Sequence, residues 1–226
     1  MKNESYENSV RAIPKDYYSF ESYNSKNRIL TYWYQITEII STKPKSVLEI
    51  GIGSGMITGY LKQIGIEVKT LDVNRNLNPD FLYSVLDLKN NALNIGLYDV
   101  VVCCRVLHHV EFINLEHALE NIHSTTKKYV VLSLPVDEAR FYLMSRYTSS
   151  PIFTISIKFP NFFKKLYKQI AKGNIGSGLW QINSSKETSL QNVNSIINKN
   201  FKIIRGYQVP EDKSHYIYLL EKKPLP

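Results

Sequence analysis

Cysteine and long apolar segments are both scarce in this chain of 226 residues. Its two cysteines, Cys103 and Cys104, are neighbours within an apolar run. Adjacent residues of a strand point to opposite faces, so this pair matches neither a disulfide framework nor the spacing of a metal site. No apolar run approaches the roughly 18 residues of a membrane-spanning helix, and the polar start, MKNESYENSVRAIP, lacks the apolar core of a signal peptide. The sequence therefore predicts a cytoplasmic protein without a metal.

Acidic residues are missing from one long segment. Between Glu138 and Glu187 there is no aspartate or glutamate. The whole chain has a net charge of +8, and the rest of it has 20 basic residues (28 minus 8) against 20 acidic ones, so this segment carries the entire imbalance. A surface with charge of one sign attracts partners of the opposite sign. The eight basic residues of the segment are Arg140, Arg146, Lys158, Lys164, Lys165, Lys168, Lys172 and Lys186.

The most informative stretch runs from Val47 to Leu61 and reads VLEIGIGSGMITGYL. A short apolar run leads into three alternate glycines, Gly51, Gly53 and Gly55, where the backbone must turn tightly or approach a ligand. Apolar residues then recur at helical spacing as far as Gly65. A strand, a glycine loop and a helix in this order form the first unit of a nucleotide-binding α/β sheet, with the ligand over the loop.

The elements that follow predict the fold class. Strands that alternate with helices indicate a parallel, doubly wound sheet, and two final strands joined by a short turn at 210–212 must be antiparallel. We therefore expect an α/β fold with a mostly parallel seven-stranded sheet and an antiparallel last strand. A first helix is expected from Lys26, with Ile29, Trp33, Ile36 and Ile40 on its apolar face. The expected strands are at 47–50, 66–71, 81–86, 98–104, 129–134, 201–207 and 215–221. Further helices are expected at 57–64, at 115–122 and after a capping box formed by Ser184 and Glu187.

Three segments are expected in the chain. Residues 1–43 form an N-terminal helical cap, and residues 44–226 form the main domain. An irregular, aromatic and basic insertion interrupts that domain at 136–183.

The glycine stretch resembles motif I of the class I S-adenosylmethionine-dependent methyltransferases. It reads E-x-G-x-G-x-G from Glu49, whereas the third glycine of a dinucleotide fingerprint would fall on Met56. The segment Val106-Leu107-His108-His109 resembles the V-L-x-H sequence after the fourth strand in the small-molecule, type-11-like branch of that family. The resemblance implies a Rossmann-like methyltransferase fold, S-adenosylmethionine as cofactor and S-adenosylhomocysteine as product.

The resemblance also implies a set of cofactor-binding residues. An acidic residue in motif I holds the ammonium group, and the acids that end the second and third strands bind the ribose and the adenine. The residues after the fourth strand lie against the methionine part. The resulting set is Glu49, Gly51, Gly53, Gly55, Asp72, Val73, Asp87, Leu88, Cys104 and Arg105.

Two histidines, His108 and His109, are the candidate catalytic residues. An imidazole near neutrality can take a proton from an O–H or N–H acceptor while the methyl group moves by in-line displacement. The alternative is that His109 only orients its loop, because this histidine is common in relatives with different substrates. We expect His117, His123 and His215 to be surface residues without a role, and we expect Tyr17, Tyr18 and Trp180 to bind the substrate.

The insertion predicts the chemistry of the acceptor. Phe162, Phe163, Leu166, Tyr167 and Ile170 share one helical face beside several lysines. Such a helix covers the acceptor as a lid, or it lies on an anionic membrane surface, which would make the protein peripheral to the membrane. We favour the lid, and expect a small-molecule or lipid-like, anionic acceptor. The alternatives are an RNA methyltransferase that holds RNA with this insertion and a cofactor-binding module without catalysis.

Overall fold

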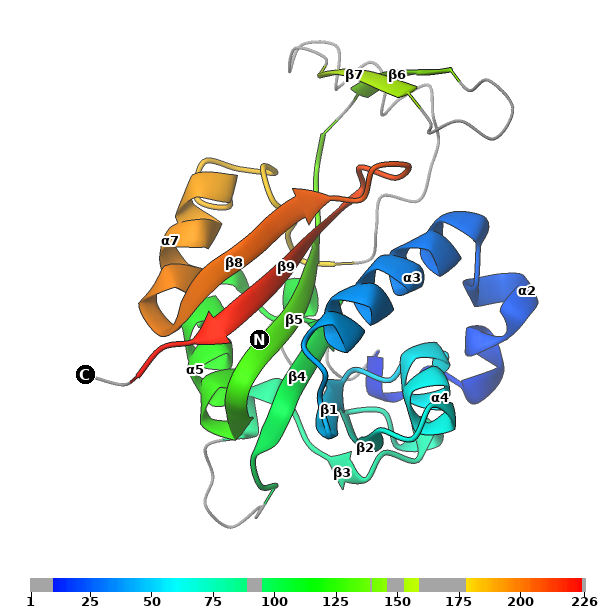
Figure 1. The fold of residues 1–226 in the computed structure, drawn as a ribbon, viewed down its shortest axis with the longest axis vertical. Coiled ribbons are helices and arrows are strands. Elements are labelled where there is room, and N and C mark those ends of the chain that lie inside the picture. Colours follow the sequence, from blue (N-terminus) through cyan, green and yellow to red (C-terminus); the bar gives the residue numbers. More distant parts are fainter. Residues whose placement is uncertain (1–9, 89–94, 139, 146–152, 159–177, 225–226) are drawn as a thin grey trace.

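The computed structural model describes residues 10–88, 95–138, 140–145, 153–158 and 178–224. They form an α/β fold around a seven-stranded sheet with helices on both faces (Figure 1). Along the sheet the strand order is β3-β2-β1-β4-β5-β9-β8. The strands are β1 (Ser46–Ile50), β2 (Glu67–Asp72), β3 (Phe81–Leu82), β4 (Tyr98–Cys104), β5 (Thr126–Pro135), β8 (Phe201–Gln208) and β9 (His215–Lys222).

The directions of the strands confirm the predicted fold class. β1 is parallel to β2 and β4, with Glu49 opposite Thr70 and Val102, and β4 is parallel to β5. β9 is antiparallel to both β5 and β8. The carboxyl ends of β1, β2 and β4 therefore meet at one edge of the sheet.

Helices cover the two faces of the sheet in pairs (Figure 1). α3 (Lys26–Ser41) and α4 (Met56–Gln63) pack on one face, and α5 (Leu115–Thr125) and α7 (Leu190–Asn200) pack on the other. Side chains alternate along β4: Val100 and Val102 are buried in the first layer, and Val101 and Cys103 in the second. A strand with apolar residues on both faces is expected at the centre of such a sheet. Among the described residues, no helix is long and apolar enough to cross a bilayer.

The buried face of α3 differs from the predicted one. Trp33 is 59% exposed, whereas the polar residues Gln35 and Glu38 are buried. Gln35 donates a hydrogen bond to the Ser133 hydroxyl at 3.1 Å, and Arg205 pairs with Glu38 at 2.7 Å. These partners on β5 and β8 compensate the burial of the polar groups, so the helix packs on a stripe that hydrophobic spacing does not identify.

Several other expectations at the level of elements are wrong. β3 has only two residues, and the chain then forms the 3-10 helix η3 (Val85–Asp87) in place of a strand to residue 86. α7 begins after Ser189, whose hydroxyl accepts from Asn192 N–H, so the predicted capping box precedes the helix. His123 and His215 are buried rather than on the surface.

The insertion is more regular than expected where it is described. Strands β6 (Arg140–Ser145) and β7 (Phe153–Lys158) pair antiparallel in a separate two-stranded sheet (Figure 1). The prediction of an irregular segment is therefore wrong for these residues. The aromatic helix expected at 162–172 lies outside the described residues.

Candidate functional site

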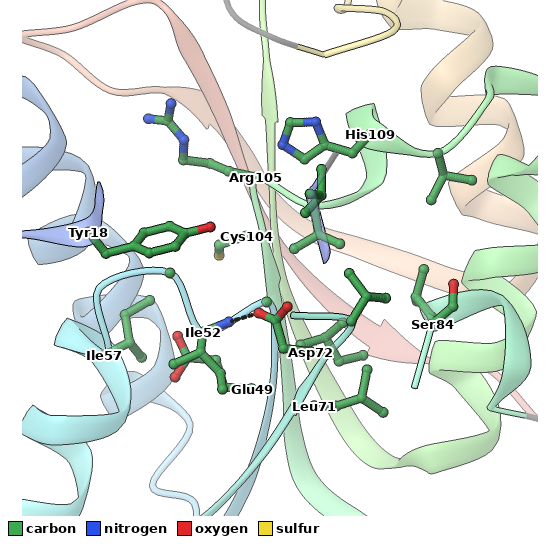
Figure 2. Close-up of a pocket in the computed structure, with 18 of the residues that line it drawn as sticks. Tyr18, Glu49, Ile52, Ile57, Leu71, Asp72, Ser84, Cys104, Arg105 and His109 are labelled. Atoms are coloured by element: carbon green, nitrogen blue, oxygen red, sulfur yellow. Dashed lines mark hydrogen bonds between the residues drawn. The ribbon is translucent and has the colours of Figure 1, made fainter. Parts of the chain in front are cut away.

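A cavity that is open to solvent lies at the carboxyl ends of β1, β2 and β4 (Figure 2). The strand order reverses between β1 and β4, and ligands of open α/β sheets bind at such a switch point. The predicted site residues that line the cavity are Tyr18, Glu49, Gly51, Gly53, Asp72, Val73, Cys104, Arg105 and His109.

The glycine loop presents its backbone to this cavity, with no side chain at Gly51 and Gly53. At Gly51, with φ of 82°, a Cβ would lie 2.2 Å from Cγ2 of Val106. At Gly53, with φ of 55°, a Cβ would contact the Tyr23 hydroxyl at 3.4 Å. The backbone conformation therefore favours glycine at both positions, and at Gly51 the space requires it as well. Gly55 caps the N-terminus of α4 with φ of 73° and is not part of the cavity wall.

Asp72 ends β2 with its carboxylate held in place. Its Oδ2 accepts from Ile52 N–H at 2.9 Å (Figure 2), and its Oδ1 accepts from Asn74 N–H at 2.8 Å. Burial raises the pKa of Asp72, and the backbone hydrogen bonds act in the opposite direction. Each carboxylate oxygen can accept a second hydrogen bond, so the group can still bind a pair of hydroxyls from the cavity.

Glu49 lies deeper, on β1, and is only 3% exposed. The Thr58 hydroxyl on α4 donates a hydrogen bond to it. Burial raises the pKa of Glu49 to about 8, although the hydrogen bonds from Thr58 lower it. A cationic ligand beside Glu49 would favour the carboxylate, because an opposite charge stabilises the ionised form.

The part of the cavity where the resemblance would place the adenine has other residues than expected. Asp87 and Leu88 do not line the cavity, and Leu88 packs in the hydrophobic core. Ser84 and Val85 stand there instead, because β3 stops at Leu82 and η3 turns the chain. The signal that sequence reasoning missed is Ser84 itself, a residue type that commonly caps a helix and here accepts from Leu86 N–H.

The end of β4 brings Cys104 and Arg105 to the cavity. Burial raises the pKa of the Cys104 thiol to about 12, so the thiol remains protonated. Arg105 has a φ of 61°, and its backbone N–H donates to the Ser133 carbonyl at 3.0 Å. Its side chain extends to the opposite side of the pocket from Glu49 and Asp72 (Figure 2). The backbone at Cys104 and Arg105 therefore lies near the glycine loop, whereas the Arg105 guanidinium lies on the opposite side of the pocket from Glu49 and Asp72.

The two candidate histidines have different positions. His109 lines the cavity, whereas His108 is 6% exposed and lies behind it, with the ring centroids 3.9 Å apart. Burial and the charge of Arg105 lower the pKa of His109 to about 4. Burial and His109 also lower the pKa of His108, so both rings are neutral near pH 7. Of the two, His109 is the one that can meet a ligand.

His108 has a packing role in this arrangement. A Cβ at Gly178 would lie 2.1 Å from Cδ2 of His108, and Leu179 N–H donates to the His108 carbonyl at 2.8 Å. Nearby, Trp180 is buried and donates from Nε1 to the Val110 carbonyl at 2.9 Å. The structure thus places Trp180 behind the histidine loop, outside the cavity wall.

Tyrosines of the N-terminal segment close one side of the cavity. Tyr18, in the 3-10 helix η1 (Lys15–Tyr18), lines it, as do Tyr23 of α2 (Phe20–Tyr23) and Tyr32 of α3. Burial, and then the nearby Tyr23 and Asp72, raise the pKa of Tyr18. Tyr17 is half-exposed and stands outside, packed edge-on against Tyr18 at 5.2 Å. Sequence reasoning missed Tyr23 and Tyr32.

The side chains around the cavity fit S-adenosylmethionine. Asp72 offers acceptors for a ribose diol, Glu49 offers a carboxyl for a cationic amine, and the bare loop at Gly51 admits close approach. No cluster of three potential metal ligands occurs within the described parts of the chain.

Comparisons with known proteins agree with this fit. A family described as a methyltransferase domain matches residues 26–164, more than half of the chain. No curated protein matches the sequence significantly.

Solved structures provide a second comparison. The fold is similar to that of the N-methyltransferase NodS from Bradyrhizobium japonicum WM9 in complex with S-adenosyl-L-homocysteine, with a TM-score of 0.60 and 11% identity over 99% of this chain and 100% of that chain. It is similar to the 1,6-didemethyltoxoflavin-N1-methyltransferase of Burkholderia thailandensis, with a TM-score of 0.58 and 14% identity over 98% and 91% of the two chains. It is also similar to the magnesium protoporphyrin IX methyltransferase of Synechocystis PCC 6803, with a TM-score of 0.57 and 15% identity over 87% of this chain and 85% of that chain. At these identities the similarity concerns the fold.

Proposed function

The chain belongs to the class I S-adenosylmethionine-dependent methyltransferases, and we propose that it methylates an anionic small-molecule or lipid-like acceptor. The observation that carries this proposal is the cavity at the sheet edge, where Glu49, the glycine loop and Asp72 converge. Two of the structural neighbours described above are named for small-molecule acceptors, magnesium protoporphyrin IX and 1,6-didemethyltoxoflavin, which supports a small molecule over RNA.

The chain's own residues would hold the cofactor at three points. Asp72, with Val73 beside it, would accept the ribose hydroxyls, and Glu49 would pair with the ammonium group. Ser84 and Val85 would border the adenine. When bound, S-adenosylmethionine supplies a methyl group on a positively charged sulfur, which is a good leaving group for in-line displacement.

His109 would act on the acceptor side of this arrangement. Its low pKa leaves the imidazole neutral, with a lone pair that can accept a proton from an O–H or N–H group. Because His109 is buried beside Arg105, its imidazole is a weak base. It would therefore take the acceptor's proton as the methyl group is transferred, and not before. We assign His108 the task of holding the loop, since Gly178 and Leu179 pack on it.

The N-terminal tyrosines and the insertion would exclude water from the reaction. Tyr18, Tyr23 and Tyr32 already line one side of the cavity, and we propose that residues 136–183 cover the acceptor as a lid. We also propose a cytoplasmic location, as the sequence predicts. Peripheral membrane association would require the insertion to bind anionic lipid.

A methylation screen tests the proposal. The purified protein and methyl-labelled S-adenosylmethionine are added to a lysate, which is then separated into RNA, lipid and small-molecule fractions. Label in the small-molecule or lipid fraction, retained on an anion exchanger, supports the proposal. Label in RNA alone would contradict it and indicate an RNA methyltransferase. Binding of the cofactor without any methyl transfer would indicate a cofactor-binding module without catalysis.

A variant separates a catalytic His109 from a structural one. His109→Ala should lower kcat about 100-fold while the affinity for S-adenosylhomocysteine stays within about threefold. Loss of cofactor affinity together with turnover would mean that His109 supports the loop.

A further inference from the structure

Two arginines, one in the cavity wall and one beside it, have no acidic partner among the described residues. Arg105 lines the cavity, and the Arg28 guanidinium carbon stands 3.7 Å from the centroid of Tyr23, which also lines it. Nε of Arg28 is buried without a hydrogen-bond partner. Within the described parts of the chain, neither side chain forms an ion pair.

The groups that face these arginines do not neutralise them. The two guanidinium groups are close enough for Arg28 to lower the pKa of Arg105, after the larger effect of burial. Asp212, in the turn between β8 and β9, is the acidic group that acts on Arg105, but its Oδ1 accepts from Ser214 N–H at 3.0 Å and it forms no ion pair with the arginine. His215 is neutral, because burial, Arg105 and Arg28 lower its pKa to about 3.

Two like charges in a half-buried site are unfavourable unless a counter-charge joins them. The arginine guanidinium is planar and presents several donors, so it matches the oxygens of carboxylate and phosphate. The Tyr23 ring holds the Arg28 guanidinium by a cation–π contact, which fixes it before any ligand arrives. A pair of this kind is suited to bind one oxyanion.

We propose that Arg28 and Arg105 bind a carboxylate or phosphate group of the methyl acceptor. The inference rests on the proposed function and names the recognised group. Arg105 and His109 follow one another closely in the chain, and both lie on the side of the pocket opposite Glu49 and Asp72 (Figure 2). The cofactor is assigned to the acidic side, so the cationic side is left for the acceptor, next to the proposed base. The anion would then orient the reacting O–H or N–H toward His109.

The test uses phenyl phosphate as the probe, titrated into the complex of the full chain with S-adenosylhomocysteine. Binding is followed by calorimetry and by the rise in melting temperature, with phenol as the neutral control. We expect phenyl phosphate to bind and phenol not to bind. Arg28→Gln and Arg105→Gln should each weaken the phosphate affinity at least tenfold, whereas Arg105→Lys, which keeps the charge, should weaken it less. Arg75→Gln is the matched control, because Arg75 is exposed on the 3-10 helix η2 (Arg75–Leu77) outside the cavity wall.

The anion bound by the two arginines could come from the acceptor or from the cofactor's own carboxylate. The affinity for S-adenosylhomocysteine separates these two sources. If the acceptor supplies it, Arg105→Gln binds S-adenosylhomocysteine within about threefold of the wild type. A tenfold loss for S-adenosylhomocysteine, with unchanged affinity for 5′-methylthioadenosine, which lacks the amino acid, would assign the pair to the cofactor's own carboxylate and overturn the inference. Absence of phenyl phosphate binding to the wild-type complex would also overturn it. A protein whose S-adenosylhomocysteine complex binds phenyl phosphate, but which transfers no methyl group from S-adenosylmethionine in the lysate screen, would instead refute the proposed function and leave the anion site in place.

Discussion

Replacing Asp72 by asparagine is the sharpest perturbation of the cofactor site. The side chain keeps its shape but loses its charge and one acceptor oxygen. Ile52 and Asn74 both donate backbone hydrogen bonds to the carboxylate, at 2.9 and 2.8 Å, so one of them loses its acceptor in the variant. Asp72→Ala would leave both backbone donors without an acceptor and disturb the glycine loop as a whole. Its effect on cofactor affinity could then not be separated from its effect on folding.

The expected magnitude follows from the hydrogen bonds. A hydrogen bond to a charged acceptor contributes about 1.5–3 kcal/mol, and asparagine keeps one neutral acceptor for the diol. We therefore expect a loss of about 2 kcal/mol in cofactor affinity, which is about 30-fold in Kd. The free energy of unfolding should also fall by about 1–3 kcal/mol, because one buried N–H group is left unpaired.

Calorimetric titration with S-adenosylhomocysteine is the assay, and Asp80→Asn is the matched control. Asp80 also accepts a backbone hydrogen bond, from Thr70 at 2.9 Å, and pairs with Lys69 at 3.1 Å, but it is not part of the cavity wall. The control should lose stability and keep its affinity. Affinity of Asp72→Asn within threefold of the wild type would refute the assignment of Asp72 to the ribose.

Three further predictions follow from the buried groups. Glu49 has a raised pKa of about 8, so binding of the cofactor's ammonium group should release close to one proton near pH 7, seen by calorimetry in two buffers of different ionisation enthalpy. His109 should titrate near pH 4 by NMR, and Arg105→Gln should raise that pKa because a like charge is removed. Gly178→Ala should destabilise the fold by about 1–3 kcal/mol in denaturant, since the new Cβ would lie 2.1 Å from the His108 ring.

The sign of the Glu49 effect also fixes a stability trend. Between its ordinary value of 4.5 and about 8, the folded protein binds more protons than the unfolded chain, so the unliganded fold should lose stability as the pH rises through this range. Glu49→Gln should weaken the trend, to which Asp72 also contributes because burial raises its pKa, and should abolish the proton release. For Gly178, the control is Gly59→Ala in α4, where no atom stands within 4 Å of the new Cβ and we expect a gain of about 0.5–1 kcal/mol. A normal titration of His109 near 6.5, or an unchanged stability of Gly178→Ala, would contradict the described packing.

The parts of the fold that depend on local chemistry were predictable from sequence. The glycine loop, the apolar β4 and Asp72 at the end of β2 follow from backbone freedom, side-chain periodicity and the chain direction, whereas Asp87 does not reach the cavity. The antiparallel β9 followed from a connection too short for a crossover. Glu49 and Asp72 accordingly stand where the motif placed them.

The remaining features depend on partners far away in the chain. Gln35 is buried because it bonds Ser133, 98 residues later, and Glu38 because Arg205 pairs with it across 167 residues. Neither contact leaves a signal in hydrophobic spacing. Arg28 is similar: its place beside the cavity follows from α3 packing on the sheet and from the Tyr23 ring, not from any local motif.

The most direct test of the account is the balance between methyl transfer and product formation. In the fractionated lysate, each labelled methyl group gained by an anionic small molecule or lipid should correspond to one S-adenosylhomocysteine formed. Both should fall together in Asp72→Asn when S-adenosylmethionine is below saturation, and both should stay at the wild-type level in Asp80→Asn. A wild-type protein that binds S-adenosylmethionine yet forms no S-adenosylhomocysteine with any fraction would contradict the account.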